Sequence, residues 1–359
     1  MTFASVRLYT RSTIFKKMLE EIIGYEALWD SMMKCKSGVM WKSSVANFVL
    51  RGVCEVAKLC DELYDGTYRE KPRKTFIITS PKRREIVSVH FRDRVYQRSL
   101  NDAAVYPEMV KHFIYDNAAC QKGKGTDFAR GRLKCHMQRY YRKHGTNGFI
   151  LKMDVRGYYP NMRHDVVKAM FARYLSPEIF GRVKRVIEQY PGDVGFNPGS
   201  QMIQIAGIST LNSIDHFIKE RLRVKHYLRY MDDMIVIGET REELQSVKEA
   251  VAARLAMIGF ELHQDKTIIM PLTQGVMFLG FRFRLTASGK VVLAIDPDRV
   301  KTERRKLRRM ARKMRNGEIT RGKILECYGS WRNHASHGTG IALLYRMDAY
   351  LLDLLNQSE

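Results

Sequence analysis

Two apolar runs rich in β-forming residues dominate the hydrophobic pattern of the chain. Residues 228–238 read Leu-Arg-Tyr-Met-Asp-Asp-Met-Ile-Val-Ile-Gly, and two adjacent carboxylates, Asp232 and Asp233, separate the strand-like halves of this run. The pattern predicts a β-hairpin with both aspartates at or near its tip. Residues 149–155 form another strand-like run, and Asp154 lies at its end.

These three carboxylates are candidates for a metal site. Neighbouring aspartates repel each other and are costly to hold near an apolar core unless a cation neutralises them. Hard oxygen ligands on a rigid turn suit Mg²⁺. An acidic β-turn without chemistry is the alternative, because Asp is common in turns. If Asp154 meets Asp232 and Asp233, two ions held there would activate an attacking oxygen and stabilise a leaving oxygen in phosphoryl transfer.

Hydrophobic spacing in the first half of the chain predicts helices and a small hairpin. Residues up to about 70 look helical, with apolar stripes over residues 15–23 and 45–53. Two short β-type runs at 75–78 and 86–89 flank a basic turn, which predicts a second hairpin.

Longer helices are predicted in the second half. One helical run spans residues 205–222, and an amphipathic helix spans 242–257. Asp296 and Pro297 form a favourable N-cap and first-turn pair for a helix that ends near residue 314, and another helix is expected to start near Thr320. The helix after Pro297 is densely basic, which a nucleic-acid duplex lying against it would explain best.

Composition and charge narrow the class of partner. The 359 residues suffice for two or three subdomains, and 62 Lys and Arg against 38 Asp and Glu give a formal net charge of +24. That excess points to a polyanion, with nucleic acid ahead of a membrane surface. Because no apolar run approaches the roughly 20 residues of a spanning helix and no signal peptide is recognisable, we expect a cytoplasmic protein. The six cysteines are expected to be reduced and mostly buried.

The motifs together resemble the reverse transcriptase family. Tyr230-Met231-Asp232-Asp233 matches its best-known motif, and the strand ending at Asp154 resembles the preceding catalytic strand. The resemblance runs from about residue 75 to 338. It implies an α+β right-hand polymerase fold, in which a palm with an antiparallel sheet lies between fingers and a helical thumb. The expected division is a helical N-terminal region at 1–70, fingers at 71–150, a palm with an interleaved fingers segment at 151–290 and a thumb at 291–359.

The resemblance also implies roles for the catalytic residues. Asp154, Asp232 and Asp233 would hold two Mg²⁺ ions together with the backbone of Val155, and Mn²⁺ is the alternative ion. Lys266, in a segment that matches the family's next motif, would protonate the leaving pyrophosphate as a general acid. An exposed lysine without a catalytic role is the alternative.

Basic residues of the fingers are expected to bind the incoming nucleotide. Lys82 and Arg84, in the basic turn, would clamp the triphosphate on the face away from the metals. Arg92 belongs to the segment Phe91-Arg92-Asp93-Arg94, in which Arg92 or Arg94 would contact the template or the triphosphate. A buried Arg–Asp pair that fixes the fingers is equally compatible with this segment.

Other substrate contacts are implied farther along the chain. Tyr159 matches the family's steric gate, a ring that would clash with a 2′-hydroxyl, although core packing is the alternative. Gln204 aligns with the Gln of a Gly-x-x-x-Ser-Gln box if Ile203 replaces the Ser, whereas Ser200-Gln201 offers a different register. The run Phe278-Leu279-Gly280 resembles the primer grip, a hairpin whose glycine could let the primer backbone approach closely.

The box containing Gln204 favours compact bacterial branches of the family, such as diversity-generating retroelement and defence-associated enzymes. The expected reaction is RNA-directed addition of dNTPs to a primer. Template-independent or protein-primed synthesis at the same site, or a nucleic-acid-binding scaffold with a vestigial site, are the alternatives. No nuclease extension or Cys/His finger motif is recognisable, so we expect dependence on an RNA template with its own structure, an accessory protein or a homo-oligomer.

Overall fold

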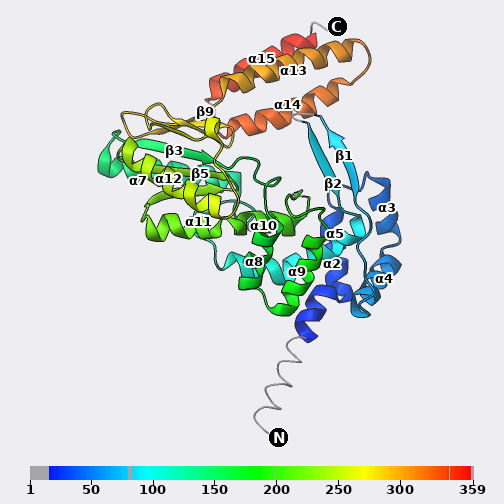
Figure 1. Ribbon diagram of the computed structural model, residues 1–359. Coiled ribbons are helices and arrows are strands. Elements are labelled where there is room, and N and C mark those ends of the chain that lie inside the picture. Colours follow the sequence, from blue (N-terminus) through cyan, green and yellow to red (C-terminus); the bar gives the residue numbers. More distant parts are fainter. Residues whose placement is uncertain (1–15, 80–82, 198, 339, 357–359) are drawn as a thin grey trace.

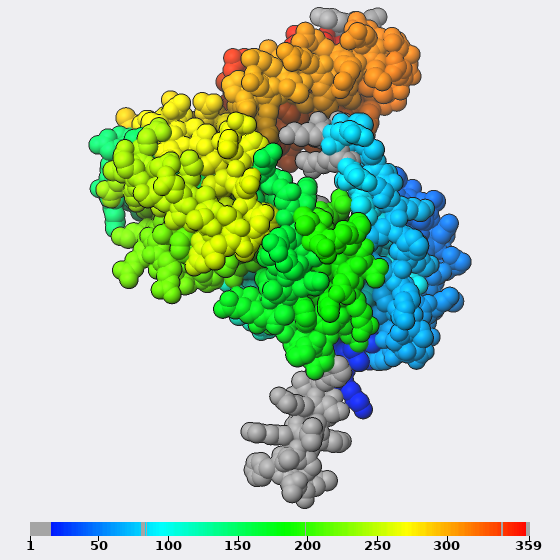
Figure 2. All heavy atoms as spheres, viewed as in Figure 1, coloured from blue at the N-terminus to red at the C-terminus, as the bar shows by residue number. Residues whose placement is uncertain are grey.

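The computed structural model describes residues 16–79, 83–197, 199–338 and 340–356. Helices surround a four-stranded antiparallel sheet, a small hairpin stands beside them, and three long helices lie above both in the view of Figure 1. Figure 2 shows an open hollow between the thumb helices and the parts of the molecule below them.

The N-terminal region and fingers consist of helices and a two-stranded hairpin that projects from them (Figure 1). In chain order, the elements are a helix at residues 16–23, α2 (Tyr25–Lys36), α3 (Ser43–Leu50), α4 (Gly52–Tyr64), β1 (Lys74–Ile78), β2 (Arg84–Ser88), α5 (Phe91–Leu100), the π-helical segment η1 (Asn101–Val105), α6 (Tyr106–Val110) and α7 (Thr126–His144). Strands β1 and β2 pair antiparallel, as predicted.

One predicted helical stripe, residues 45–53, spans two helices instead of one. Arg51 lies between α3 and α4 with ψ at 21°, and Gly52 begins the second helix. A Cβ on Gly52 would lie 3.1 Å from the Met32 side chain. The glycine therefore allows α4 to approach α2 closely.

The palm contains the central sheet and its covering helices. Its elements are β3 (Phe149–Asp154), α8 (His164–Tyr174), α9 (Pro177–Glu188), α10 (Gln201–Thr210), α11 (Asn212–His216), the π-helical segment η2 (Phe217–Arg221), β4 (His226–Tyr230), β5 (Asp233–Gly238), α12 (Arg241–Met257), the 3₁₀ segment η3 (Gln264–Lys266) and β6 (Ile268–Pro271). The strand order is β4-β5-β3-β6, with antiparallel pairs throughout.

The predicted helical run at 205–222 is helical over nearly its whole length, but the structure divides it into α10, α11 and η2. The hydroxyl of Thr210 donates to the carbonyl of Ala206 (2.8 Å) at the end of α10. Such a bond back to the preceding turn bends helices. The break lets α11 begin anew and place Asp215 under the sheet.

Both faces of the palm sheet are buried. Leu151 and Met153 of β3 point into a core shared with the fingers, whereas Ile150 packs into a second core with α7 and the hairpins that follow. Successive strand residues face opposite sides, so Lys152 and Asp154 lie on the same face as Ile150. Two polar residues thus end a strand that is otherwise apolar.

The thumb follows a three-stranded sheet. The elements are β7 (Val276–Phe278), β8 (Phe281–Leu285), β9 (Val291–Ile295), α13 (Pro297–Arg315), α14 (Arg321–Ser336) and α15 (Ile341–Asn356). The predicted N-cap is confirmed, since Asp296 accepts a hydrogen bond from the amide of Asp298 (2.9 Å). Thr320 caps α14 in the same way, and Leu307, Ile324 and Met347 form the centre of the three-helix core.

All six cysteines are free, as predicted, but the expectation that most are buried is wrong. Cys54 is exposed, and the other five are partly exposed. Cys35, Cys60 and Cys120 pack at the margin of the largest core, where a small thiol needs no complete burial. Within the described ranges, no helix has the length and apolar character needed to cross a membrane.

Candidate active site

The register of the palm sheet brings the three predicted carboxylates together. Asp154, the last residue of β3, pairs directly with Asp233, the first residue of β5. Tyr230 ends β4 opposite the same Asp233, so Met231 and Asp232 form a two-residue hairpin turn. Like charges placed directly opposite each other on two strands are destabilising.

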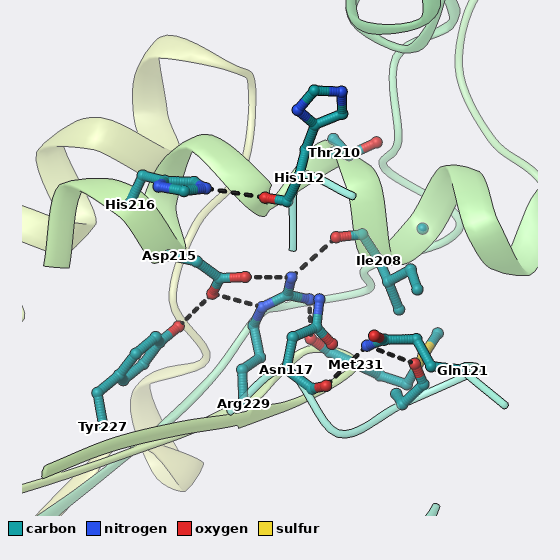
Figure 3. Close-up of polar contacts among 12 residues, drawn as sticks. His112, Asn117, Gln121, Ile208, Thr210, Asp215, His216, Tyr227, Arg229 and Met231 are labelled. Carbon is teal, nitrogen blue, oxygen red and sulfur yellow. Dashed lines mark hydrogen bonds and ion pairs between the residues drawn. The ribbon is translucent and has the colours of Figure 1, made fainter. Parts of the chain in front are cut away.

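The hairpin turn has an unusual backbone. Met231 has a φ of +55°, in the left-handed region that non-glycine residues seldom adopt. Two-residue hairpin turns require positive φ at such a position. The guanidinium of Arg229 donates to the Met231 carbonyl (2.9 Å), and Figure 3 shows this contact behind the turn.

Arg229 belongs to a fully buried polar network. Its Nε and Nη2 atoms donate to the two carboxylate oxygens of Asp215 (2.7 and 2.6 Å), and both side chains have no exposed area. The hydroxyl of Tyr227 donates to the same carboxylate (2.6 Å), as Figure 3 shows. A second bond from Nη2 reaches the Ile208 carbonyl (2.8 Å) in α10. The network therefore ties the hairpin turn of Met231 and Asp232 to the helices beneath the sheet.

Two lysines neutralise the carboxylates. The ammonium of Lys266 lies 2.9 Å from Asp154 Oδ2, and that of Lys152 lies 3.0 Å from Asp233 Oδ1. The hydrogen bond to Asp154 raises the pKa of Lys266. Lys266 is half exposed, whereas Lys152 is largely buried, so only the former can readily move toward a substrate.

Burial perturbs the aspartates of the hairpin. The pKa of Asp232 rises to about 6, first because burial disfavours the charged form and then because Asp233 and Asp154 lie nearby. Burial also raises the pKa of Asp233, although the ammonium of Lys152 opposes this shift. Carboxylates held in this way gain stability from a cation between them.

The carboxylate oxygens of Asp154, Asp232 and Asp233 are ligands of the kind that a hard divalent cation prefers. Across the described ranges, no three His, Cys, Asp or Glu side chains lie close enough together to be recognised as a formed metal site. In the arrangement seen here, lysine ammonium groups supply the positive charge. Val155 forms a bridge with Leu262 in which the carbonyl of Asp154 and the amide of Arg156 make the hydrogen bonds. The Val155 carbonyl takes no part in these two bonds.

The structure describes two of the three residues of the fingers that were predicted to bind the triphosphate. Lys82 lies outside the described residues, and Arg84 begins β2. Arg92 is buried on α5, where it forms an ion pair with Glu62 and lies 5.0 Å from the ring of Tyr68. Its role in substrate contact stays a prediction, and the structure shows it within an internal polar cluster.

Tyr159 packs against α10, and Gln204 belongs to this helix. The ring of Tyr159 packs against Gly207, where a Cβ would lie 2.7 Å from its hydroxyl, and that buried hydroxyl has no hydrogen-bond partner in the described structure. Gln204 is half-buried and lines a small hollow with Gln201 and Lys122. Ser200 caps α10 by accepting a hydrogen bond from the Ile203 amide (3.3 Å).

The predicted primer-binding residues form a tight hairpin that touches the thumb. Phe278 is buried at the end of β7, and Leu279 and Gly280 form the turn with φ of +46° and +91°. A Cβ on Gly280 would lie 2.7 Å from Arg299 of α13 and 3.0 Å from His334 of α14. The backbone conformation therefore favours glycine here, and a side chain at this position would have to displace the ends of Arg299 and His334.

Two functional features were absent from the sequence-based prediction. Lys152 could have been found, because it is the one charged residue within an apolar strand and lies two positions before Asp154, on the same face. The pairing of Arg229 with Asp215 has no comparable signal, since it depends on how α11 packs under the sheet.

Comparison with known proteins identifies the class of enzyme. Residues 71–283, more than half of the chain, match the reverse transcriptase (RNA-dependent DNA polymerase) family. The chain belongs to this family, which confirms the predicted right-hand polymerase fold and the predicted enzyme class.

Individual relatives are distant. An 84-residue segment is 32% identical to the Gag-Pol polyprotein of Rous sarcoma virus subgroup C (strain Prague) and covers 22% of this chain and 5% of the polyprotein. Telomerase from Candida albicans, solved with a fragment of telomeric RNA, is 12% identical with a TM-score of 0.47, covering 80% of this chain and 55% of that one. Apo telomerase from Candida tropicalis gives 12% identity and a TM-score of 0.46, covering 71% and 53%. This chain thus spans about half the length of the telomerases and a small part of the polyprotein.

Proposed function

We propose that this protein is an RNA-directed DNA polymerase that adds dNTPs to the 3′ end of a primer. The observation that carries the proposal is the pairing of Asp154 with Asp233 across β3 and β5, beside Asp232 in the hairpin turn. Three carboxylates at the end of a rigid sheet suit in-line phosphoryl transfer. Membership of the reverse transcriptase family supports RNA as the template.

Asp154, Asp232, Asp233 and the Val155 carbonyl would hold two Mg²⁺ ions, with Mn²⁺ as the alternative. When bound, such ions activate the attacking oxygen and stabilise charge on the leaving oxygen. The raised pKa of Asp232 supports this assignment, because a buried carboxyl beside two others favours a cationic partner.

The residues of this chain position the reactants. The primer 3′-hydroxyl attacks the α-phosphorus, a new P–O bond forms, and the bond to pyrophosphate breaks. Lys266 protonates the leaving pyrophosphate, since its ammonium is half exposed and bound only to a carboxylate that would take up another cation. Lys152 stays with Asp233 and holds that carboxylate in place.

Substrate selection falls to residues around this centre. Lys82, Arg84 and Arg92 would bind the triphosphate, and Gln204 would contact the nucleotide or template. Tyr159 would exclude a 2′-hydroxyl, a role supported by its packing against Gly207, which leaves the ring little freedom to move.

The thumb would hold the primer–template duplex. Four arginines on α13, at positions 305, 308, 309 and 312, are exposed and repeat at helical spacing on one face. None has an ion-pair partner among the described residues, so they remain available for phosphates. The hairpin of Phe278, Leu279 and Gly280, which contacts the thumb, would support the primer.

We further infer a compact bacterial enzyme of a diversity-generating retroelement or a phage-defence system, acting in the cytoplasm. The box containing Gln204 supports this choice. Its partners would be an RNA template with defined structure, DNA, and an accessory protein or a second copy of the chain. The formal net charge of +24 supports nucleic-acid partners.

Primer extension on poly(rA)/oligo(dT) with Mg²⁺ tests the central proposal. Wild type should extend the primer, Asp232→Ala/Asp233→Ala should not, and Asp353→Ala, which removes an exposed thumb carboxylate, should extend it normally. Extension by the double variant would contradict the assignment of the carboxylates. Homopolymer formed without added template would instead support template-independent synthesis. RNA binding with no extension on any template would support the scaffold alternative.

A further inference from the structure

A hollow of about 1010 Å³ lies at the end of the palm sheet opposite the catalytic turn. Its strand residues are His226 of β4 and Ile237 and Gly238 of β5, whereas Tyr230 and Asp233 lie at the other end of the same strand pair. His226 and Tyr230 are four positions apart in β4, which corresponds to about 13 Å along an extended strand. Helices α7 and α12, which flank the hollow, lie on the side of the molecule away from the β1–β2 hairpin (Figure 1).

Five cationic side chains line this hollow. They come from the end of α7 and from the loop before β4, and all are exposed: Arg139, Arg142, Lys143, Arg223 and Lys225. Throughout the described ranges none of them forms an ion pair, unlike surface cations such as Lys184, which pairs with Glu188. The lining also contains two carboxylates, so the cations outnumber the anions: a Glu239 oxygen lies 3.4 Å from His144 Nδ1, and Glu243 accepts a hydrogen bond from the Glu239 amide (2.8 Å).

Hydrogen bonds from Lys219 hold the loop that carries Arg223 and Lys225. The ammonium of Lys219 donates to the carbonyls of Val224 and Lys225 (3.2 Å each). Arg223 has a φ of +52°, a conformation that costs on the order of 1 kcal/mol or more in a non-glycine residue. The fold therefore holds the loop in a strained shape with Arg223 and Lys225 at the hollow.

The local electrostatic potential is positive. The pKa of His226, at the base of the hollow, falls to about 4, first because of burial and then because of nearby cations that include Lys219 and Arg139. Attraction to the negative, C-terminal end of the α7 helix dipole would explain why Arg142 and Lys143 occur in the last turn of this helix. It does not account for Arg223 and Lys225, which belong to a separate segment.

The positive surface extends beyond one hollow. Leu222 and Arg223 line the first hollow, and the preceding Arg221 lines a second one together with Lys111, Arg173 and Arg254. The two hollows meet at consecutive residues 221–223, and cations spread over more than the width of one phosphate favour a polymer with regularly spaced negative charges over a small anion.

We propose that this surface, defined by Arg139, Arg142, Lys143, Arg223 and Lys225, is a docking site for the phosphate backbone of RNA, separate from the catalytic cleft. It would hold a structured part of an RNA whose single-stranded part enters the cleft. This inference extends the proposed function, and the test below separates the two because RNA affinity and nucleotide addition are measured independently.

The test compares two doubly charge-reversed variants that change net charge equally. Lys143→Glu/Arg223→Glu alters the docking site, and Lys58→Glu/Arg185→Glu alters two exposed cations on α4 and α9 that form no ion pair with any residue the structure describes. The probes are a labelled RNA stem-loop, titrated over a range of salt concentrations, and a short RNA/DNA hybrid for primer extension. Thermal unfolding checks that both variants fold.

The docking-site variant should bind the stem-loop about tenfold or more weakly than the control variant, and its slope of log K against log salt should fall by about 2, one per lost phosphate contact. Extension of the short hybrid should match that of the control. Equal RNA affinities and slopes in the two variants would overturn the docking site. Failure of the wild type to extend the hybrid would count against the proposed function alone, since the affinity comparison would still decide the docking site.

Discussion

Replacing Arg229 should separate the stability of the palm from the activity of the catalytic turn. Arg229→Met removes a guanidinium with no exposed area and leaves the Asp215 carboxylate buried without its cation. Breaking a buried pair in this way costs about 3–5 kcal/mol of unfolding free energy. Arg163→Met, which breaks an exposed pair with Asp165, should change stability little.

A second variant also removes the buried charge of Asp215, but it does not restore the contact that Arg229 made with the turn. In Arg229→Met/Asp215→Asn, the amide can still accept the hydrogen bond from Tyr227, and no uncompensated charge remains. Most of the lost stability should return, because replacing both members of a buried pair is often close to neutral. The bond from Arg229 to the Met231 carbonyl (2.9 Å) stays absent, so the strained turn loses its support.

The activity of this double variant decides the argument. A catalytic group displaced by about 1 Å can cost 10²-fold in rate, so kcat for primer extension should fall about 100-fold with little change in KM for dNTP. Urea unfolding gives the stability, and steady-state extension gives kcat and KM. Recovery of both stability and kcat to wild-type values would refute the view that Arg229 positions the turn.

Two further predictions concern the pH dependence and sugar selectivity of the site. Because the fold raises the pKa of Asp232 from 3.8 to about 6, its protonated form stabilises the metal-free protein below pH 4, and this contribution is lost as pH rises through 6. Asp232→Asn should therefore show a smaller fall in unfolding free energy between pH 4 and 7 in EDTA, and an equal fall would argue against burial as the cause. Tyr159→Ala should reduce discrimination against ribonucleotides about tenfold or more, whereas Tyr159→Phe should keep it. Competition between dNTP and rNTP in extension assays measures this selectivity. Unchanged selectivity in the Ala variant would exclude Tyr159 as the steric gate.

Local pattern predicted several elements well because their signals lie within a few residues. The hairpin of 228–238 follows from two β-forming apolar runs on either side of the aspartates, and the thumb helix from the Asp296-Pro297 start. The helical run at 205–222 was predicted, but its division after Thr210 was not, because the burial of Asp215 depends on Tyr227 and Arg229, which lie outside that run. Apolar spacing alone carries no information about such breaks.

By itself, the sequence determined the class of protein and the three carboxylates, since motif order, net charge and strand periodicity are all properties of the chain in one dimension. Only the tertiary structure decided which charges meet. Sheet register placed Asp154 opposite Asp233, and packing joined Lys266 to Asp154 across more than a hundred residues. Packing also buried Arg229 against Asp215 behind the catalytic turn. These pairings depend on three-dimensional proximity in a medium of low polarity, where an unpaired charge is costly and each partner must be supplied by a different element.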